Sequence, residues 1–262
     1  MKISVIGIGA MGGAMVKGFL KGERFMPADI TVSAPSQMTL DRFAETGISL
    51  TSDNQVAAQH SDIVCVVVKP WIVEQVLTEI KPVMDYRRQM LVVVAAGIKG
   101  EQINEWMKKD DGSIPQSFLV IPNTAIEVMS SMTFIAPVNA SKENTRLLCD
   151  IFNENGQAMV VEEKLLAAGT TMASCGIAYA MRYVRAASEG GVELGFKADL
   201  AKNIVLQTVK GAVALLQANG NHPEAEIDKV TTPGGVTIRG LNEMEHAGFT
   251  SAVIRGLKAG VK

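Results

Sequence analysis

The first part of the chain alternates short, continuous apolar runs with stretches in which apolar residues recur at helical spacing. The runs Ile63 to Val68 and Leu91 to Val94 contain no charged or strongly polar side chain. Strands buried on both faces have this appearance, and they are typical of parallel sheets covered by helices. The same reasoning predicts strands at residues 2–6, 29–33, 63–68, 90–94, 118–121, 132–136 and 158–161. Helical patterns between most of these runs predict a doubly wound, mostly parallel sheet of the α/β class.

After about Glu162 the strand signals stop, and the pattern is helical to the end of the sequence. Helices are predicted at residues 165–172, 174–194, 197–219, 223–230, 237–247 and 250–259. We therefore expect two domains, an α/β domain over residues 1–161 and an all-α domain over residues 162–262. The two long helices are apolar on more than one face, and a domain of about 100 residues offers few neighbours to cover them. The helical domain is therefore expected to form a homodimer or a higher homo-oligomer.

Charge and cysteine content narrow the classes of partner. The 262 residues carry a formal net charge of −2 and no basic cluster, which favours neither nucleic acid nor an anionic membrane surface as a partner. No apolar stretch approaches the roughly 20 residues that span a bilayer. Cys65, Cys149 and Cys175 stand far apart, without the spacing of a zinc site or a disulfide framework. We expect a cytoplasmic protein with a small-molecule substrate, no membrane partner and no metal site.

A glycine-rich turn follows the first predicted strand and opens the first predicted helix. It reads Gly7-Ile8-Gly9-Ala10-Met11-Gly12, a G-x-G-x-x-G pattern. In this context Gly7 would form the tight turn, Gly9 would let the backbone approach a pyrophosphate, and Gly12 would let helix and strand pack closely. The helix N-terminus would face the phosphates. The pattern predicts a Rossmann-like dinucleotide-binding domain.

The end of the second predicted strand bears on the choice of dinucleotide. An acidic residue at that place would pair with the ribose 2′-hydroxyl of NAD, whereas this chain has Ser33-Ala34-Pro35-Ser36 there. Without an acidic group to repel a 2′-phosphate, NADP(H) is favoured, and NAD(H) stays possible because no Arg stands in that loop. Two later strand ends, Val68-Lys69-Pro70 and Ala95-Ala96-Gly97, are also expected at the cofactor crevice.

A second glycine turn lies near the C-terminus, between two predicted helices. It reads Thr231-Thr232-Pro233-Gly234-Gly235-Val236-Thr237. Pro233 fixes φ, and the two glycines permit conformations that a Cβ would forbid. If a helix begins near Val236, its first amides and the Thr237 hydroxyl face whatever precedes it. A small anionic substrate would suit this place, and a simple turn that caps a helix is the alternative.

Together these motifs resemble the pyrroline-5-carboxylate reductase family, nearly from end to end. Members of that family carry GxGxMG near residue 10, then VKP, AAG and PNTP after later strands, a QTxxG helix, and an SPGGTT-like segment. This chain has the corresponding motifs in the same order, at residues 7–12, 68–70, 95–97, 122–124, 207–211 and 232–237. The resemblance implies reduction of 1-pyrroline-5-carboxylate to L-proline by hydride transfer from NADPH or NADH, the last step of proline biosynthesis.

The resemblance also implies roles for individual residues. The catalytic residue would be Thr237, whose hydroxyl would hydrogen-bond the imine nitrogen, while helix-start amides bind the carboxylate. Substrate binding would fall to Gly234, Gly235, Val236 and Thr237. The cofactor-binding residues would be Ile6, Gly7, Ile8, Gly9, Ala10, Met11, Ser33, Asn54, Val67, Val68, Lys69, Pro70, Ala95, Ala96 and Gly97.

Two segments depart from the family pattern. The usual SGSGPAY reads Ala173-Ser174-Cys175-Gly176-Ile177-Ala178-Tyr179 here, and PNTP ends in Ala125. The first change affects a helix start close to the substrate in the family, so the shape of the pocket stays open, and packing is the simpler role for Ser174. Two other functions are therefore kept in view, a β-hydroxyacid-dehydrogenase-like oxidoreductase and a non-catalytic NADP(H)-binding regulatory protein. Dehydrogenases of the first kind use a lysine early in the helical domain as the acid/base group, and this chain has no lysine in the corresponding residues 167–172.

Overall fold

The computed structural model describes residues 1–261, and contacts between residues divide the chain into two compact units, 1–177 and 178–262. The predicted boundary after residue 161 lies earlier than this division, because the first helical turns after the sheet pack on the sheet itself. The domain boundary after residue 161 stays a prediction. Lys262, the last residue of the predicted helical domain, lies outside the described residues. Within the described chain, no helix is long and apolar enough to cross a membrane.

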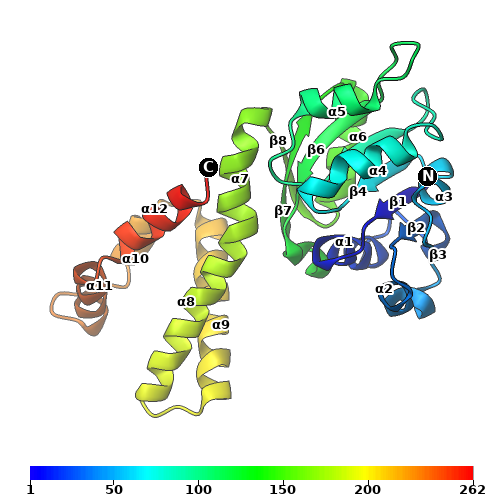
Figure 1. The fold of residues 1–262 in the computed structure, drawn as a ribbon. Helices are drawn as coiled ribbons and strands as arrows, with labels where there is room; N and C mark the ends of the chain where they lie inside the picture. The colour runs from blue at the N-terminus through cyan, green and yellow to red at the C-terminus, as the bar shows by residue number, and fades with distance from the viewer. Residues whose placement is uncertain (262) are drawn as a thin grey trace. The chain divides into compact units, whose positions relative to one another are not determined.

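The N-terminal unit is built on one eight-stranded sheet of order β3-β2-β1-β4-β5-β6-β7-β8 (Figure 1). The strands are β1 (Ile3–Ile6), β2 (Ile30–Ser33), β3 (Ser49–Thr51), β4 (Ile63–Val66), β5 (Met90–Val93), β6 (Gln116–Ile121), β7 (Ser131–Pro137) and β8 (Gly156–Val160). All neighbours are parallel except β6 and β7. The predicted Rossmann-like, mostly parallel α/β fold is therefore confirmed.

Helices cover both faces of this sheet, and each face has its own core. On one face α1 and α6 pack with η4, where Phe19 and Phe152 meet edge to face with ring centroids 6.0 Å apart. On the other face α3, α4 and α5 pack around residues such as Leu77 and Ile103. The bounds of these elements are α1 (Ala10–Lys21), α2 (Gln37–Leu40), α3 (Asn54–Gln59), α4 (Val73–Ile80), α5 (Gly100–Met107), η4 (Thr124–Val128) and α6 (Lys142–Asn153). Successive residues of a strand point to opposite faces, which is why the strands need continuous apolar runs.

The sheet differs from a uniformly parallel one at β7, for a reason of chain length. Only residues 122–130 join β6 to β7, whereas a parallel crossover needs a dozen or more residues. Val120 therefore pairs with Ile135 in an antiparallel ladder. The short strand β3, which our sequence analysis did not predict, has a single large apolar residue, Leu50.

The first helix after the sheet is continuous where the sequence analysis predicted a break after residue 172. The helix α7 (Leu166–Gly169) passes into a π-helical turn, Thr170–Cys175, and then into α8 (Gly176–Glu193). Gly169 lets this helix lie against β7, since a Cβ there would come within 2.7 Å of the Phe134 ring. Backbone bonding thus changes pattern at the predicted break, and the helix continues.

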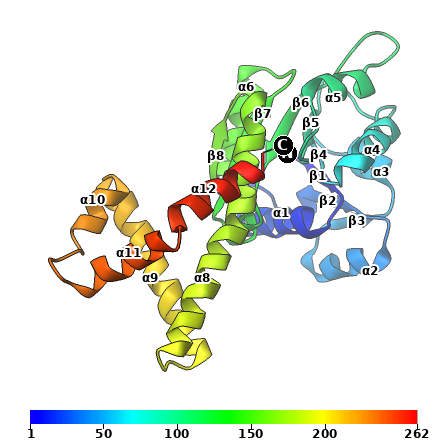
Figure 2. The ribbon, with the colours of Figure 1, turned by 60° about the vertical axis from the view of Figure 1, so that its left-hand side comes forward.

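The C-terminal unit is helical, as predicted, and it contains most of α8 and four further helices (Figure 2). These helices are α9 (Ala198–Asn219), α10 (Pro223–Asp228), α11 (Val236–His246) and α12 (Phe249–Ala259). The helices α8 and α9 form a hairpin closed at Gly191, where a Cβ would lie 3.0 Å from that of Ala201. Ala201 is the one buried residue in residues 178–261.

Candidate functional site

The carboxyl ends of the central strands lie in register at one edge of the sheet. Ile6 at the end of β1 pairs with both Ser33 of β2 and Val66 of β4, and Val66 pairs with Val93 of β5. The chain leaves β1 towards β2 on one side and returns to β4 on the other, so the strand order reverses between β1 and β4. Ligands of open α/β sheets bind at such a point. Three predicted loops, at residues 7–11, 67–70 and 95–97, therefore meet at one edge.

Gly7 in the loop after β1 and Gly12 in the first turn of α1 allow close packing of the backbone. Gly7 has φ +92°, and a Cβ on it would lie 2.4 Å from the carbonyl oxygen of Val67. A Cβ on Gly12 would lie 2.0 Å from the carbonyl oxygen of Gly7. These distances leave no room for any side chain, so the loop after β1 and the loop after β4 are in direct contact.

Gly9 has the opposite surroundings, and this tests whether the site suits a dinucleotide. It is exposed, and a Cβ built on it would have no heavy atom within 4 Å. Gly9 is also the N-cap of α1, a 12-residue helix, and no side chain caps the first amides of that helix. An open approach to uncapped helix-start N–H groups is the arrangement that holds a pyrophosphate. The residues present therefore fit the predicted cofactor.

Two side-chain hydrogen bonds in series join the end of β2 to α3 and α4. The fully buried Ser33 hydroxyl donates to Asn54 Oδ1 at 2.6 Å, and Asn54 Nδ2 donates to Glu79 Oε2 at 2.9 Å. The Ser33 proton thus points into the protein, and Ser33 holds the Asn54 amide in place. The exposed hydroxyl of this loop belongs to Ser36.

One cation near this edge was not found by the sequence analysis. Arg42 lies in η2 (Asp41–Thr46), after α2, and its guanidinium would be 3.7 Å from a Cβ on Gly13 of α1. Arg42 is exposed. The sequence analysis looked for Arg only in residues 33–36, and a search through the next helical turns would have found it.

The other two loops expose backbone at the same edge. Ala95 is buried, whereas Ala96 and Gly97 are exposed, and Gly97 has φ +80° with open space where a Cβ would stand. In the loop after β4, Lys69 is exposed and Pro70 begins η3 (Pro70–Ile72). The small residues at 95–97 leave room for a ribose. The exposed Lys69 ammonium is available to a negatively charged group.

The second glycine turn lies in the C-terminal unit and has the local geometry that the sequence predicted. The helix α11 begins at Val236, and no side chain caps its N-terminus. Gly234 has φ +68°, and the Gly235 N–H donates to the carbonyl oxygen of Thr232 at 2.9 Å. Val236 and Thr237 are exposed. The first amides of α11 and the Thr237 hydroxyl are therefore accessible on the surface of this unit.

The cysteines have the properties of packing residues. Cys65 is fully buried in β4, and burial raises the pKa of its thiol to about 12. Cys149 and Cys175 are partly exposed and also free. Within residues 1–261, no three or more His, Cys, Asp or Glu side chains gather as they would around a metal ion.

Comparison with known proteins identifies the family. A model described as "Pyrroline-5-carboxylate reductase dimerisation" matches residues 163–262, and one described as "NADP oxidoreductase coenzyme F420-dependent" matches residues 2–97. Pyrroline-5-carboxylate reductase 2 of Dictyostelium discoideum is 34% identical over 97% of this chain and 89% of its own length. The chain belongs to the pyrroline-5-carboxylate reductase family.

Two further members of the pyrroline-5-carboxylate reductase family show how far the similarity extends. Pyrroline-5-carboxylate reductase 1 of Dictyostelium discoideum is 37% identical over 97% of this chain, which spans 48% of that protein's length. A crystal structure of Plasmodium falciparum pyrroline carboxylate reductase with NADP bound has a TM-score of 0.90 and 27% identity, covering 100% of this chain and 95% of that one. The similarity therefore includes both units of the chain.

Proposed function

We propose that the protein reduces 1-pyrroline-5-carboxylate to L-proline with NADPH as the hydride donor. The observation that carries this proposal is its membership of the reductase family over nearly the whole chain, including a relative that it covers almost completely. The relative with NADP bound, and the open Gly9 edge of the sheet, support NADP(H) as the cofactor. NADH is the alternative donor.

The N-terminal unit supplies the cofactor site in this proposal. The amides at the start of α1, reached past Gly9, bind the pyrophosphate. The loops at residues 67–70 and 95–97 lie along the nicotinamide ribose, while Ser33 and Asn54 lie at the adenosine end. NADPH bound there supplies a hydride, and the protein contributes position and electrostatics.

The turn at Gly234–Thr237 supplies the substrate contacts in this proposal. The first amides of α11 bind the carboxylate, as helix N-termini bind anions. The Thr237 hydroxyl hydrogen-bonds the imine nitrogen and keeps it oriented while it carries a proton. Hydride then adds to the carbon of the C=N bond, and the ring nitrogen becomes a secondary amine. The reaction needs no nucleophilic side chain, because hydride adds directly to the C=N carbon.

Arg42 is proposed to bind the 2′-phosphate that distinguishes NADP from NAD. We expect Arg42→Ala to raise the Kd for NADPH about fivefold and to leave the Kd for NADH nearly unchanged, because an exposed charge pair contributes about 1 kcal/mol. Arg24→Ala is the matched control, since the Arg24 guanidinium already pairs with Glu154 at 2.8 Å. Titration of each variant with both nucleotides measures this. A parallel loss of NADPH and NADH affinity in Arg42→Ala would reject the assignment.

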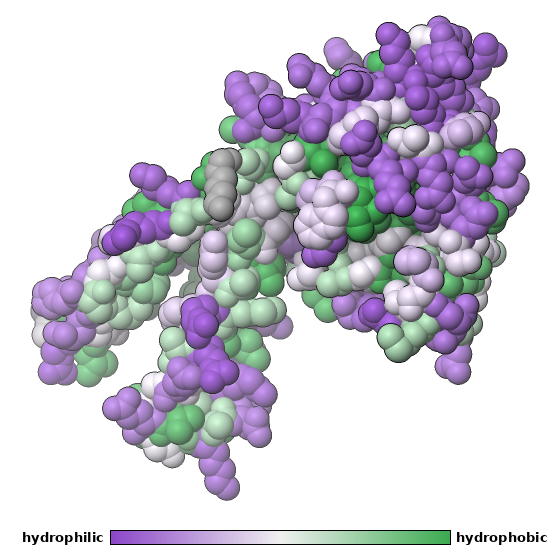
Figure 3. Space-filling view, viewed as in Figure 1, coloured by the Kyte–Doolittle hydropathy of each residue, from purple (hydrophilic) through white to green (hydrophobic). Residues whose placement is uncertain are grey.

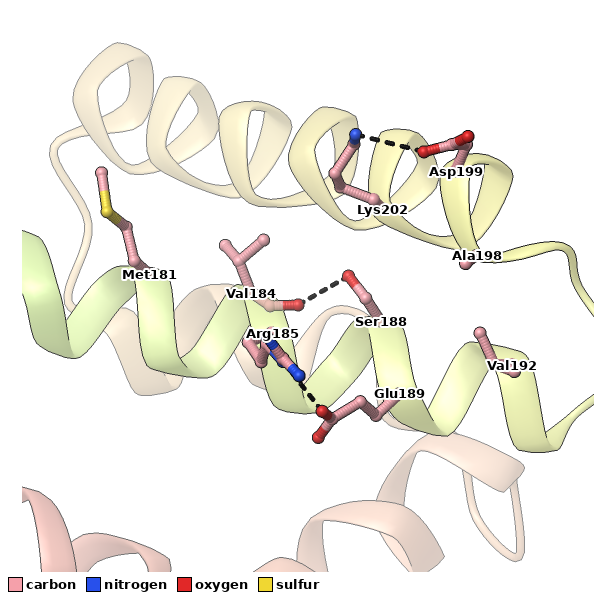
Figure 4. A pocket seen from close by; sticks show the side chains of 9 residues that line it. All are labelled: Met181, Val184, Arg185, Ser188, Glu189, Val192, Ala198, Asp199 and Lys202. Carbon is pink, nitrogen blue, oxygen red and sulfur yellow. Dashed lines mark hydrogen bonds and ion pairs between the residues drawn. The ribbon is translucent and has the colours of Figure 1, made fainter.

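The C-terminal helices support a homo-oligomer, the form implied by the dimerisation model that matches them. Large apolar side chains lie exposed along α8, α9 and α12, and apolar residues are visible on the surface of these helices (Figure 3). Examples are Met181 at 66%, Leu215 at 55% and Ile254 at 51% exposed. A groove between α8 and α9 is also partly apolar, with Met181, Val184 and Val192 along it (Figure 4). A second copy of the chain would cover these faces, as dimers of two helical domains do.

The proposed reaction is tested by following NADPH oxidation with 1-pyrroline-5-carboxylate and identifying the product. Formation of L-proline, with faster oxidation of NADPH than of NADH, is expected. A panel of β-hydroxyacids with NADP⁺ tests the alternative dehydrogenase. NADPH binding without turnover of any of these compounds would favour the regulatory alternative. A cytoplasmic location stays a prediction.

A further inference from the structure

The two segments that depart from the family pattern are in contact with each other. Ser174 stands where SGSGPAY has glycine, and Ala125 stands where PNTP has proline. The Ser174 hydroxyl donates to the carbonyl oxygen of Pro122 at 2.8 Å. The Ala125 N–H donates to Asn123 Oδ1 at 3.0 Å. Glycine has no hydroxyl and proline has no N–H, so the family residues could form neither bond.

Asn123 joins these two departures. Its side chain is 5% exposed, and its Nδ2 donates to the carbonyl oxygen of Ala173 at 3.4 Å. Because the Ala125 N–H holds Oδ1, the Nδ2 end of the amide is directed at the helix. Ala173 and Ser174 are thus attached to residues 122 and 123 by two hydrogen bonds side by side.

The attached part of the helix is the π-helical turn Thr170–Cys175. A π turn shifts backbone bonding from the i−4 to the i−5 carbonyl, and such turns are frequent at functional sites. The chain before this turn is also attached, seven residues ahead of Thr170, where the Glu163 carboxylate accepts a hydrogen bond at 3.1 Å from the Gly100 N–H at the start of α5. The π turn therefore lies on the sheet between two fixed points.

The place of attachment is next to the reacting end of the proposed cofactor site. Val93 of β5 and Leu119 of β6 form the last pair of their ladder, so the loop at residues 94–97 and residues 122–123 both leave the sheet at this carboxyl edge, from neighbouring parallel strands. The loop at residues 95–97 is the one assigned to the nicotinamide ribose. The π turn is thus attached at the strand next to the one that carries this loop, and in the proposed cofactor site it forms a wall near the nicotinamide.

We propose that Ser174 and Asn123 are positioning residues that lock the π turn onto the end of β6 and so restrict the size of the cyclic imine that the enzyme accepts. The inference rests on the proposed reductase function. A fixed wall holds a five-membered imine carboxylate close to the nicotinamide and leaves little space for a larger ring. Neither residue touches the reacting atoms in this assignment.

Ser174→Ala tests the lock with little cost to the helix, because alanine favours helix formation. We expect kcat/KM for the five-membered imine carboxylate to fall about fivefold, and that for its six-membered homologue to fall less, so that the ratio shifts at least about threefold towards the larger ring. The Kd for NADPH should not change. Ala125→Pro removes the hydrogen bond from the Ala125 N–H to Asn123 Oδ1, and it should shift the ratio in the same direction.

Ser188→Ala is the matched control. The Ser188 hydroxyl donates to the carbonyl oxygen of Val184 at 2.7 Å, within α8, so the variant loses the same kind of bond without releasing the π turn (Figure 4). An unchanged ratio of the two imines in Ser174→Ala, or an equal shift in Ser188→Ala, would overturn the proposal. A lower melting temperature with an unchanged ratio would also overturn it, because the role would then be only structural.

Hydrogen exchange separates a failure of this inference from a failure of the proposed function. In Ser174→Ala, the amides of residues 170–177 should exchange faster than in the parent protein, and in Ser188→Ala they should not. If the parent protein does not reduce the five-membered imine, the proposed function fails, while the exchange data still decide whether Ser174 holds the π turn. Unchanged exchange in Ser174→Ala would overturn the lock whatever the activity.

Discussion

Gly9→Asp is expected to weaken NADPH binding at least about 100-fold while leaving the fold of residues 1–177 intact. The Cβ has open space at this position, so the change causes no clash within the protein. Aspartate is a favourable N-cap and would bond the first amides of α1 with its own carboxylate, so the free energy of unfolding should change by no more than about 0.5 kcal/mol. The same carboxylate would occupy the place of the pyrophosphate and repel its negative charge. Loss of two charge-assisted hydrogen bonds of about 1.5 kcal/mol each already corresponds to about 100-fold.

Two variants control for size and charge in this experiment. Gly9→Asn has nearly the same shape and also caps the helix, but it carries no charge, so it should lose less affinity than Gly9→Asp. Gly190→Ala adds a methyl group in open space on α8, outside the unit that carries the cofactor edge, and should bind NADPH normally. Titration calorimetry and chemical denaturation give the two quantities. Undiminished NADPH affinity in Gly9→Asp would contradict a pyrophosphate at α1.

Thr237→Ala is expected to lower kcat/KM for 1-pyrroline-5-carboxylate by about 10- to 100-fold with no change in the Kd for NADPH. A hydrogen bond to a charged partner such as a protonated imine contributes about 1.5–3 kcal/mol, which sets this range. The hydroxyl is exposed and does not cap α11, so its removal should leave the helix stable. Steady-state kinetics and nucleotide titration together measure the effect.

Thr237→Ser provides the control, because it keeps the hydroxyl and should retain activity within about threefold. If Thr237→Ser loses as much as Thr237→Ala, the methyl group and not the hydroxyl matters, and the assigned hydrogen bond is wrong. An equal loss of turnover and NADPH affinity in Thr237→Ala would mean that the variant disturbs the whole protein.

The strands that carry the cofactor edge were predictable because each has a local signal. Residues 63–66 and 90–93 lie in the interior of a parallel sheet, and burial on both faces demands apolar residues at every position. The roles of Gly7 and Gly12 were also predictable from the motif. A Cβ at either position would lie 2.0–2.4 Å from a backbone carbonyl oxygen, so no other residue fits. In contrast, β3 has three residues and gains its strand conformation from pairing with β2, which leaves little mark on its sequence.

The contacts that shape the site in detail were not predictable, because they join distant parts of the chain. Ser174 and Pro122 are 52 residues apart, and packing was the simpler expectation for Ser174. The π turn has no sequence signal of its own, because it differs from an α-helix in backbone bonding alone. Ser33 was expected among the cofactor-binding residues, and its hydrogen bond to Asn54, 21 residues away, has no signal in the sequence.

The nearly coreless C-terminal unit has a consequence for how the protein is made. Residues 1–177 contain two hydrophobic cores and can collapse within a single chain, at a rate independent of concentration. Residues 178–261 bury only Ala201, so in the proposed homo-oligomer their apolar faces leave water when another chain associates. Assembly of the proposed homo-oligomer is therefore a bimolecular step. At low protein concentration, residues 1–177 would fold before the C-terminal helices associate with a second chain.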